Sequence, residues 1–204
     1  MKLYHLHNDE FEGEKYVEGN EFTIGGELNP FTRDFMDRST TYIESSKKEN
    51  GNLVCYHKAI LDLLDIAVIS EMSDDEKIKL VETVRGVISN NQIDIRELIM
   101  EEVRFKYFPT RPSRQTCMWF SDEQSLPYWE HILDRKKNKS IYEMEVEGNI
   151  FVSTGDLIPS GHLPHDIMFE QAMKYWDPNP EYLQYRTDKE YLATGTAKVL
   201  RRVK

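Results

Sequence analysis

The spacing of apolar positions changes along the chain, from strand-like runs near the start to helical spacing in the middle. Residues 3–7 (LYHLH) form a short run of strand-forming residues. A Gly-rich, acidic stretch follows, and its apolar residues at 22–28 alternate with polar ones, which predicts a short strand or an ordered loop. Between about 53 and 106, apolar residues recur every three or four positions. We therefore expect N-terminal strands followed by a helical segment.

The helical spacing divides into three predicted helices. The first covers residues 53–68. Ser73 and Glu76 form a capping box for the second, and Asn90-Asn91 is expected to end it. The third lies around 95–103. These helices are expected to pack on one another as one layer.

After Pro109 and Pro112 the pattern returns to strands. Residues 115–120 (QTCMWF) are rich in strand formers, and Ser121-Asp122 can cap a helix that runs to about 136. The pattern of residues 141–153 predicts a hairpin whose turn is Glu147-Gly-Asn.

The C-terminal part contains one more helix and one more strand. Asp166 is expected to open a short helix that Pro178 and Pro180 end, and residues 191–203 form the last predicted strand. We expect an α+β fold in a single domain, residues 1–204, with a helical lobe at about 53–106.

Composition narrows the class of partner. The chain has 204 residues, 36 acidic and 26 basic, and a formal charge of −10. Such a chain does not attract nucleic acids or anionic membranes non-specifically. It shows no signal peptide and no apolar run long enough for a membrane span. Cys55 and Cys117 fit free buried thiols, so we expect a cytoplasmic protein.

One segment runs against the acidic balance. Residues 104–114 (RFKYFPTRPSR) carry four cations, Arg104, Lys106, Arg111 and Arg114, and no acid. Arginine forks match phosphate oxygens, and the hydroxyls of Thr110 and Ser113 can add donors. Two interpretations stay open: an anion-binding segment, or a loop whose arginines pair with acids elsewhere.

The histidines suggest a second kind of site. His5 and His7 are two apart on a predicted strand and therefore share a face. They could bind a metal with Asp9 or Glu10, serve a structural role, or place His5 against a ligand. His162 and His165 lie in a Pro-bearing loop at no recognised ligand spacing. We expect no metal.

The order of several segments resembles a known family. Tyr4-His5-Leu6 opens the chain, FPTRPSR (108–114) precedes a strand, and AMKYW (172–176) and EYLATGTAKVL (190–200) follow. This order is similar to that of small, uncharacterised bacterial and phage proteins with an ADP-ribosyltransferase-like fold. The resemblance covers residues 1–11 and about 100–203.

The resemblance implies a split, twisted β-sheet core that holds NAD as substrate. His5 would contact the nicotinamide ribose, and Ser113 and Arg114 would lie near the ribose or the pyrophosphate. Glu190 would be the catalytic carboxylate that stabilises the oxocarbenium ion. The basic segment, with Arg104 and Arg111, would face the pyrophosphate. The tyrosine that stacks on nicotinamide is left open among Tyr107, Tyr128 and Tyr142.

Three functions follow as expectations. The first is an NAD-dependent transferase that binds a small anionic dinucleotide and passes ADP-ribose to an acceptor, such as a protein. The alternative is a catalytically inactive interaction, immunity or regulatory module on the same fold, whose acids engage a basic protein partner. A third is a metal-dependent hydrolase that uses His5 and His7.

Overall fold

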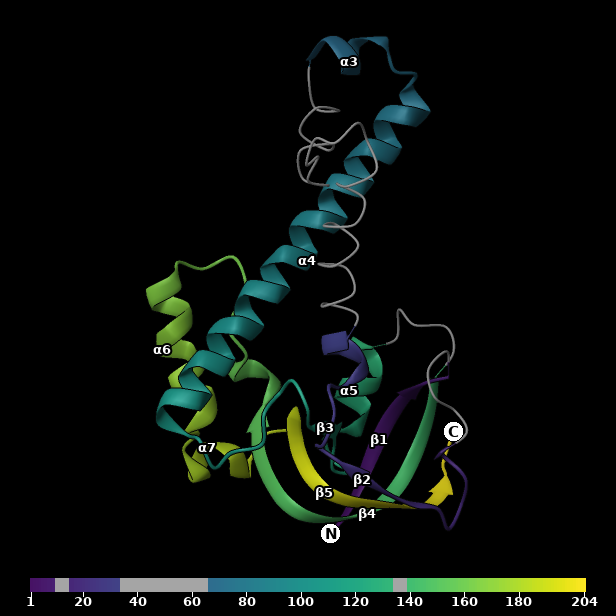
Figure 1. The fold of residues 1–204 in the computed structure, drawn as a ribbon, viewed down its shortest axis with the longest axis vertical. Coiled ribbons are helices and arrows are strands. Elements are labelled where there is room, and N and C mark those ends of the chain that lie inside the picture. Colours follow the sequence, from purple (N-terminus) through teal and green to yellow (C-terminus); the bar gives the residue numbers. More distant parts are fainter. Residues whose placement is uncertain (10–14, 34–65, 134–138) are drawn as a thin grey trace. The chain divides into compact units, whose positions relative to one another are not determined.

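The computed structural model describes residues 1–9, 15–33, 66–133 and 139–204 (Figure 1). The chain divides into two compact units, one formed by Met1–Pro30 and Arg96–Lys204 and the other by Phe31–Ile95. The single domain expected from the sequence stays a prediction. In chain order the elements are β1 (Lys2–Asn8), β2 (Glu21–Ile24), α3 (Ile66–Glu71), α4 (Asp74–Tyr107), β3 (Met118–Phe120), α5 (Leu126–Ile132), β4 (Lys139–Thr154), η2 (Gly155–Leu157), α6 (His165–Trp176), α7 (Pro180–Gln184) and β5 (Lys189–Arg202).

The fold is mixed α/β and contains a five-stranded antiparallel sheet. The strand order is β1-β4-β5-β2, and β3 also pairs with β5. β2 and β3 lie one after the other along the same edge of β5, β2 opposite residues 195–198 and β3 opposite 191–193. The predicted arrangement, with strands at both ends of the chain and helices between them, is confirmed at this level.

The sheet curls until its outer strand β1 contacts β3. Tyr4 and Ser121 exchange two backbone hydrogen bonds, each 2.8 Å long. Pairing therefore continues around a ring of four strands: β1, β4, β5 and β3. Figure 1 shows β4 and β5 bending together as a long curved pair. A ring of pairing satisfies backbone groups that an open edge would leave exposed.

The predicted hairpin at 141–153 is wrong, because β4 runs straight through its supposed turn. Gly148, at the centre of Glu147-Gly-Asn, instead pairs with Gly195 of β5, and the two have φ angles of +130° and +132°. A Cβ on Gly148 would lie 2.2 Å from the carbonyl oxygen of Thr194. Glycine permits the close crossing of two bent strands, and a turn motif read locally cannot be distinguished from such a bend.

Two hydrophobic cores lie on opposite faces of the sheet. Side chains alternate along β4, so Tyr142, Met144 and Val146 pack in the first core with Leu3 of β1. Phe151 points to the other face. There the second core combines β4 and β5 with α4 and α6, through residues that include Met100, Val103, Ala172, Trp176 and Leu192.

The long helix α4 differs from the sequence prediction. It is continuous from Asp74 to Tyr107, so the predicted break at Asn90-Asn91 is wrong, and the second and third predicted helices are one. Asparagine in a helix costs less than about 1 kcal/mol, and no proline interrupts residues 74–107. The capping box is confirmed: the Ser73 backbone N donates to Glu76 Oε2 at 2.8 Å.

The remaining helices and strands begin or end at other residues than the sequence predicts. Of the first predicted helix, residues 53–65 lie outside the described residues and α3 contains its end. β3 is shorter than predicted because backbone bonds from residues 116 and 117 to the Ser113 carbonyl form a turn. Asp122 caps a turn by accepting from the Ser125 N–H at 2.7 Å, so α5 begins only at Leu126. The short helix predicted from Asp166 is confirmed as α6.

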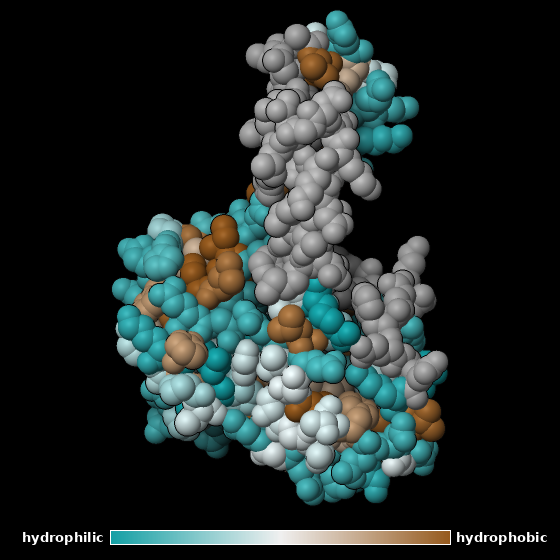
Figure 2. All heavy atoms as spheres, in the orientation of Figure 1, coloured by the Kyte–Doolittle hydropathy of each residue, from teal (hydrophilic) through white to brown (hydrophobic). Residues whose placement is uncertain are grey.

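The surface agrees with the charged composition. Figure 2 shows mostly hydrophilic residues on the described surface of this face, with smaller apolar areas between them. None of the helices in the described part of the chain has the length and apolar character that crossing a membrane requires.

Candidate functional site

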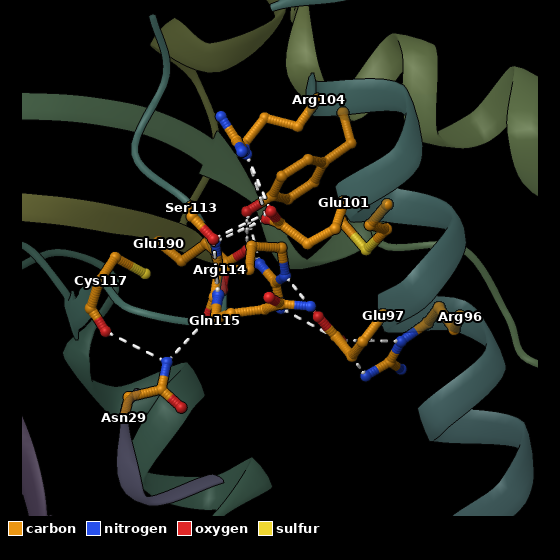
Figure 3. A network of polar contacts seen from close by, with 12 residues as sticks. Asn29, Arg96, Glu97, Glu101, Arg104, Ser113, Arg114, Gln115, Cys117 and Glu190 are labelled. Atoms are coloured by element: carbon orange, nitrogen blue, oxygen red, sulfur yellow. Dashed lines mark hydrogen bonds and ion pairs between the residues drawn. The ribbon is translucent and has the colours of Figure 1, made fainter. Parts of the chain in front are cut away.

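Arg114 is the centre of a buried polar network in the first unit (Figure 3). It belongs to the loop between α4 and β3, and it is 6% exposed. Its Nε donates to Glu97 Oε2 of α4 at 2.8 Å. Its Nη1 donates to Glu190 Oε1 of β5 at 2.7 Å. Two carboxylates from distant elements therefore share one guanidinium group.

Tyr175 of α6 completes the surroundings of Glu190. Its hydroxyl donates to Glu190 Oε1 and lies 2.6 Å from Arg114 Nη1. Oε1 thus accepts two hydrogen bonds, while Oε2 accepts none from the described residues. The Glu190 side chain as a whole is 8% exposed.

Glu101 holds the loop that carries Arg114. It accepts from the Ser113 hydroxyl at 2.9 Å and from the Arg114 backbone N–H at 2.8 Å. Its other partner is Arg104, whose Nε lies 3.0 Å away. On the opposite side, Asn29 Nδ2 donates to the Arg114 carbonyl at 2.6 Å. The backbone of Arg114 is therefore fixed independently of its guanidinium.

The charges of this network are balanced. Three arginines, Arg96, Arg104 and Arg114, face three glutamates, Glu97, Glu101 and Glu190. Of the four cations in 104–114, two are thus paired with acids, as one of the two sequence interpretations expects. Buried charges are tolerated when they are paired and hydrogen-bonded in this way.

Burial and pairing set the protonation states in the network. Burial alone would raise the pKa of Glu97, but Arg114 and Arg96 outweigh it and hold that pKa below its usual range. Burial raises the pKa of Tyr175 well above its ordinary value, so its hydroxyl stays a donor. Burial likewise raises the pKa of the Cys117 thiol well above normal, which keeps this cysteine from acting as a thiolate.

The network includes residues that sequence reasoning missed. Glu97 and Glu101 are two of them: they lie seven and three positions before Arg104, a predicted site residue, and this spacing places all three on one face of α4. That spacing was the available signal for a polar helix face. Tyr175 is another: its ring is buried in the second core, and its hydroxyl reaches the network.

Four predicted site residues meet here. Ser113, Arg114, Arg104 and Glu190 belong to the one network, although Glu190 is 76 positions from Arg114. Glu190 also lies within β5 rather than before the last strand. Arg111 is close by: its guanidinium stacks 4.6 Å from the ring centre of Phe151, on the face that also carries Glu190. Within the described part of the chain, Arg111 makes no ion pair.

His5 lies on the opposite face of the sheet. It pairs across strands with Tyr142 of the first core, whereas Glu190 pairs with Ser153, which hydrogen-bonds to the second core at Tyr175. The His5 Nδ1–H donates to the Trp119 carbonyl at 2.9 Å. Burial lowers the pKa of His5 to about 4. The structure therefore does not bring His5 and Glu190 to one surface.

The other histidines and tyrosines also lie apart from the network. His5 and His7 share a face, with ring centres 5.9 Å apart. Among residues 1–9, 15–33, 66–133 and 139–204, no three or more His, Cys, Asp or Glu side chains gather as a metal site would require. His162 and His165 are exposed before and at the start of α6. The tyrosines proposed for nicotinamide stacking contact other residues: Tyr107 contacts Phe169, Tyr128 contacts Trp129, and Tyr142 packs in the first core.

Comparison with protein families matches residues 3–204 to a family described as "Protein of unknown function (DUF2441)". The chain belongs to the DUF2441 family. No curated protein matches it. The DUF2441 match includes the whole sheet except the first residue of β1, and it includes all residues of the network around Arg114, so the candidate site lies within the matched part of the chain.

Proposed function

We propose that this DUF2441 protein is an ADP-ribosyltransferase-like protein that binds NAD and uses Glu190 as its catalytic carboxylate. The observation that supports this most is the asymmetry of Glu190. Arg114 and Tyr175 hold its Oε1, and Oε2 accepts no hydrogen bond from the described residues. Cleavage of the bond between nicotinamide and ribose builds positive charge on the sugar carbon. A fixed carboxylate oxygen stabilises that charge without reorganising.

The sharing of Arg114 supports the same role. Glu97, Arg114 and Glu190 together carry one positive and two negative charges. Arg114 therefore does not cancel the negative charge of Glu190 alone. The second partner of Glu97, Arg96, is more exposed, at 22%, and a charge near solvent is screened more strongly. The inner trio thus favours a cationic group in front of Glu190.

The pyrophosphate of NAD needs cations that are not already paired. Arg104 and Arg114 have glutamate partners, so we assign the phosphate contact to Arg111. Its guanidinium packs on Phe151, whose cross-strand partner Leu192 lies two residues from Glu190. Arginine that stacks on an aromatic ring keeps its edge free for a phosphate. The proposed site does not include His5.

The test measures NAD binding and nicotinamide release. We expect millimolar NAD to raise the melting temperature of the purified protein. We also expect slow release of nicotinamide, to water or to an acceptor. Glu190→Gln should abolish the release, because it removes the charge but keeps the shape. Glu145→Gln, at an exposed position of β4, is the matched control and should leave it unchanged. Absence of both NAD-dependent stabilisation and nicotinamide release would contradict the proposal.

The balance of charges in the network favours a second candidate, a catalytically inactive interaction module on this fold. Here Arg114 and Glu190 only join α4, α6 and β5, and the surface acids attract a basic protein. We then expect a fluorescent oligolysine peptide to bind at low salt and to dissociate at high salt, with no effect of NAD. Glu190→Gln should lower the melting temperature strongly. The first candidate instead predicts loss of activity in a folded variant.

A further inference from the structure

We propose that Glu97 is a positioning residue that acts on Glu190 through Arg114 and keeps Glu190 Oε2 open. This inference rests on the function proposed above. Glu97 lies on α4, and its hydrogen bonds come from Arg96 and Arg114 rather than from a group on Glu190. Its influence passes through the guanidinium that both residues share.

The two carboxylates bind different sides of that guanidinium. Nε lies 2.8 Å from Glu97 Oε2, and Nη2 lies 3.4 Å from Glu97 Oε1. Only Nη1 is directed at Glu190, and it bonds to Oε1. Glu97 therefore takes the side with two nitrogens, and Glu190 receives a single bond.

Among the described residues, Glu97 is the one charged partner of the guanidinium besides Glu190, and the rings of Trp119 and Tyr175 lie 5.8 and 5.2 Å from its central carbon. Glu101 and Asn29 bind the backbone N–H and carbonyl of Arg114, so they fix the backbone and do not bind the guanidinium. Tyr175 contacts Nη1 but carries no charge when protonated. The negative charge of Glu97 is what draws the Nε side of Arg114 away from β5.

The preferred geometry of an arginine and a carboxylate is bidentate, with two parallel hydrogen bonds. Without the charge of Glu97, Arg114 is expected to turn its second nitrogen to Glu190 and bind both oxygens. Oε2 would then be occupied and its charge neutralised. By competing for the guanidinium, Glu97 prevents this capture and leaves Oε2 available to a substrate.

The experiment compares Glu97→Gln with Glu102→Gln, an exposed glutamate further along α4. In Glu97→Gln, kcat for nicotinamide release should fall about tenfold or more while KM for NAD stays within about threefold. Glu102→Gln should keep kcat within about threefold, because Glu102 is exposed and lies outside the network around Arg114. Equal losses of kcat in both variants would show a general structural effect and overturn the inference.

A crystal structure of Glu97→Gln gives a measurement that does not depend on activity. Two hydrogen bonds from Arg114 to the two oxygens of Glu190 would support the inference, and retention of the single Nη1 bond would overturn it. Wild-type protein that releases no nicotinamide would contradict the proposed function, while the crystal structure still decides the orientation of Arg114.

If Glu97→Gln does not fold, a second variant, Glu97→Asp, tests the same inference. Glu97→Asp keeps the negative charge opposite the guanidinium. It should keep the single bond between Arg114 and Glu190, with kcat within about threefold of wild type. Bidentate capture of Glu190 in this charged variant would overturn the inference.

Discussion

Arg114 Nη1 lies 2.7 Å from Glu190 Oε1, and this contact joins a loop to a strand that begins 75 positions later in the chain. Both side chains are buried, at 6% and 8% exposure. Because Glu97 holds the other side of the same guanidinium, the contact connects α4, the loop before β3 and β5. Removing Arg114 would leave both buried carboxylates without the guanidinium that they share, and the predictions begin there.

The first prediction concerns the cation. Arg114→Met should destabilise the protein by roughly 3–5 kcal/mol, because Glu97 and Glu190 lose the guanidinium that both share. Urea unfolding monitored by tryptophan fluorescence measures this. Arg201→Met, which removes an ion pair between a 63% exposed arginine and Glu143, is the control and should have a much smaller effect, because Lys2 still pairs with Glu143. Similar losses in the two variants would show that the Arg114 network is no more important than a surface pair.

The second prediction concerns the hydroxyl of Tyr175. Tyr175→Phe keeps the buried ring but removes the donor to Glu190 Oε1. We expect a loss of about 1–3 kcal/mol in unfolding free energy, since a buried charged acceptor loses a partner. Tyr185→Phe is the control, because Tyr185 is 78% exposed. Thermal unfolding by circular dichroism compares them, and unchanged stability of Tyr175→Phe would contradict this role.

The third prediction tests the bend of β4. Gly148→Ala places a Cβ 2.2 Å from the Thr194 carbonyl oxygen at a φ of +130°. Backbone in this region strongly disfavours a side chain, so the variant should lose roughly 3 kcal/mol or more, or fail to fold. Gly26→Ala, where a Cβ meets nothing within 4 Å, should behave like wild type. A well-folded Gly148→Ala of normal stability would mean that β4 does not bend here.

The fourth prediction follows from the lowered pKa of His5, about 4 against an ordinary value of 6.5. Between these values the unfolded chain binds a proton that the folded protein excludes, so folding stability falls as the pH drops from 6.5 to 4. Above pH 6.5 His5 is neutral in both states and costs no stability. Below pH 4 the total loss of unfolding free energy that His5 causes reaches roughly 3 kcal/mol.

His5→Asn provides the comparison, because its amide can still donate to the Trp119 carbonyl but does not titrate. Urea unfolding at several pH values between 4 and 7.5 should give a shallower decrease for this variant. Parallel curves for the two proteins would show that His5 is not excluded from protonation in the fold.

Local sequence pattern was sufficient for the elements that depend on neighbours in the chain. The strand around His5, the helix opened near Asp166 and the capping box of Ser73 and Glu76 were all predicted and are observed. Periodicity and capping act within a few residues, so these features can be read without knowing the fold. The same local reading failed at Gly148, where a turn motif and a bent strand have the same composition.

Only the tertiary structure placed Glu97 and Tyr175 beside Arg114 and Glu190, and only it separated His5 from them by the thickness of the sheet. Cross-strand register decides which face a strand residue occupies, and a shift of one position reverses it. Ion pairs between residues 17 to 76 positions apart depend on that register and on how α4 packs against the sheet. The sequence shows many acids and one basic segment, but it does not show which acid pairs with which arginine. The folded structure determined those pairs.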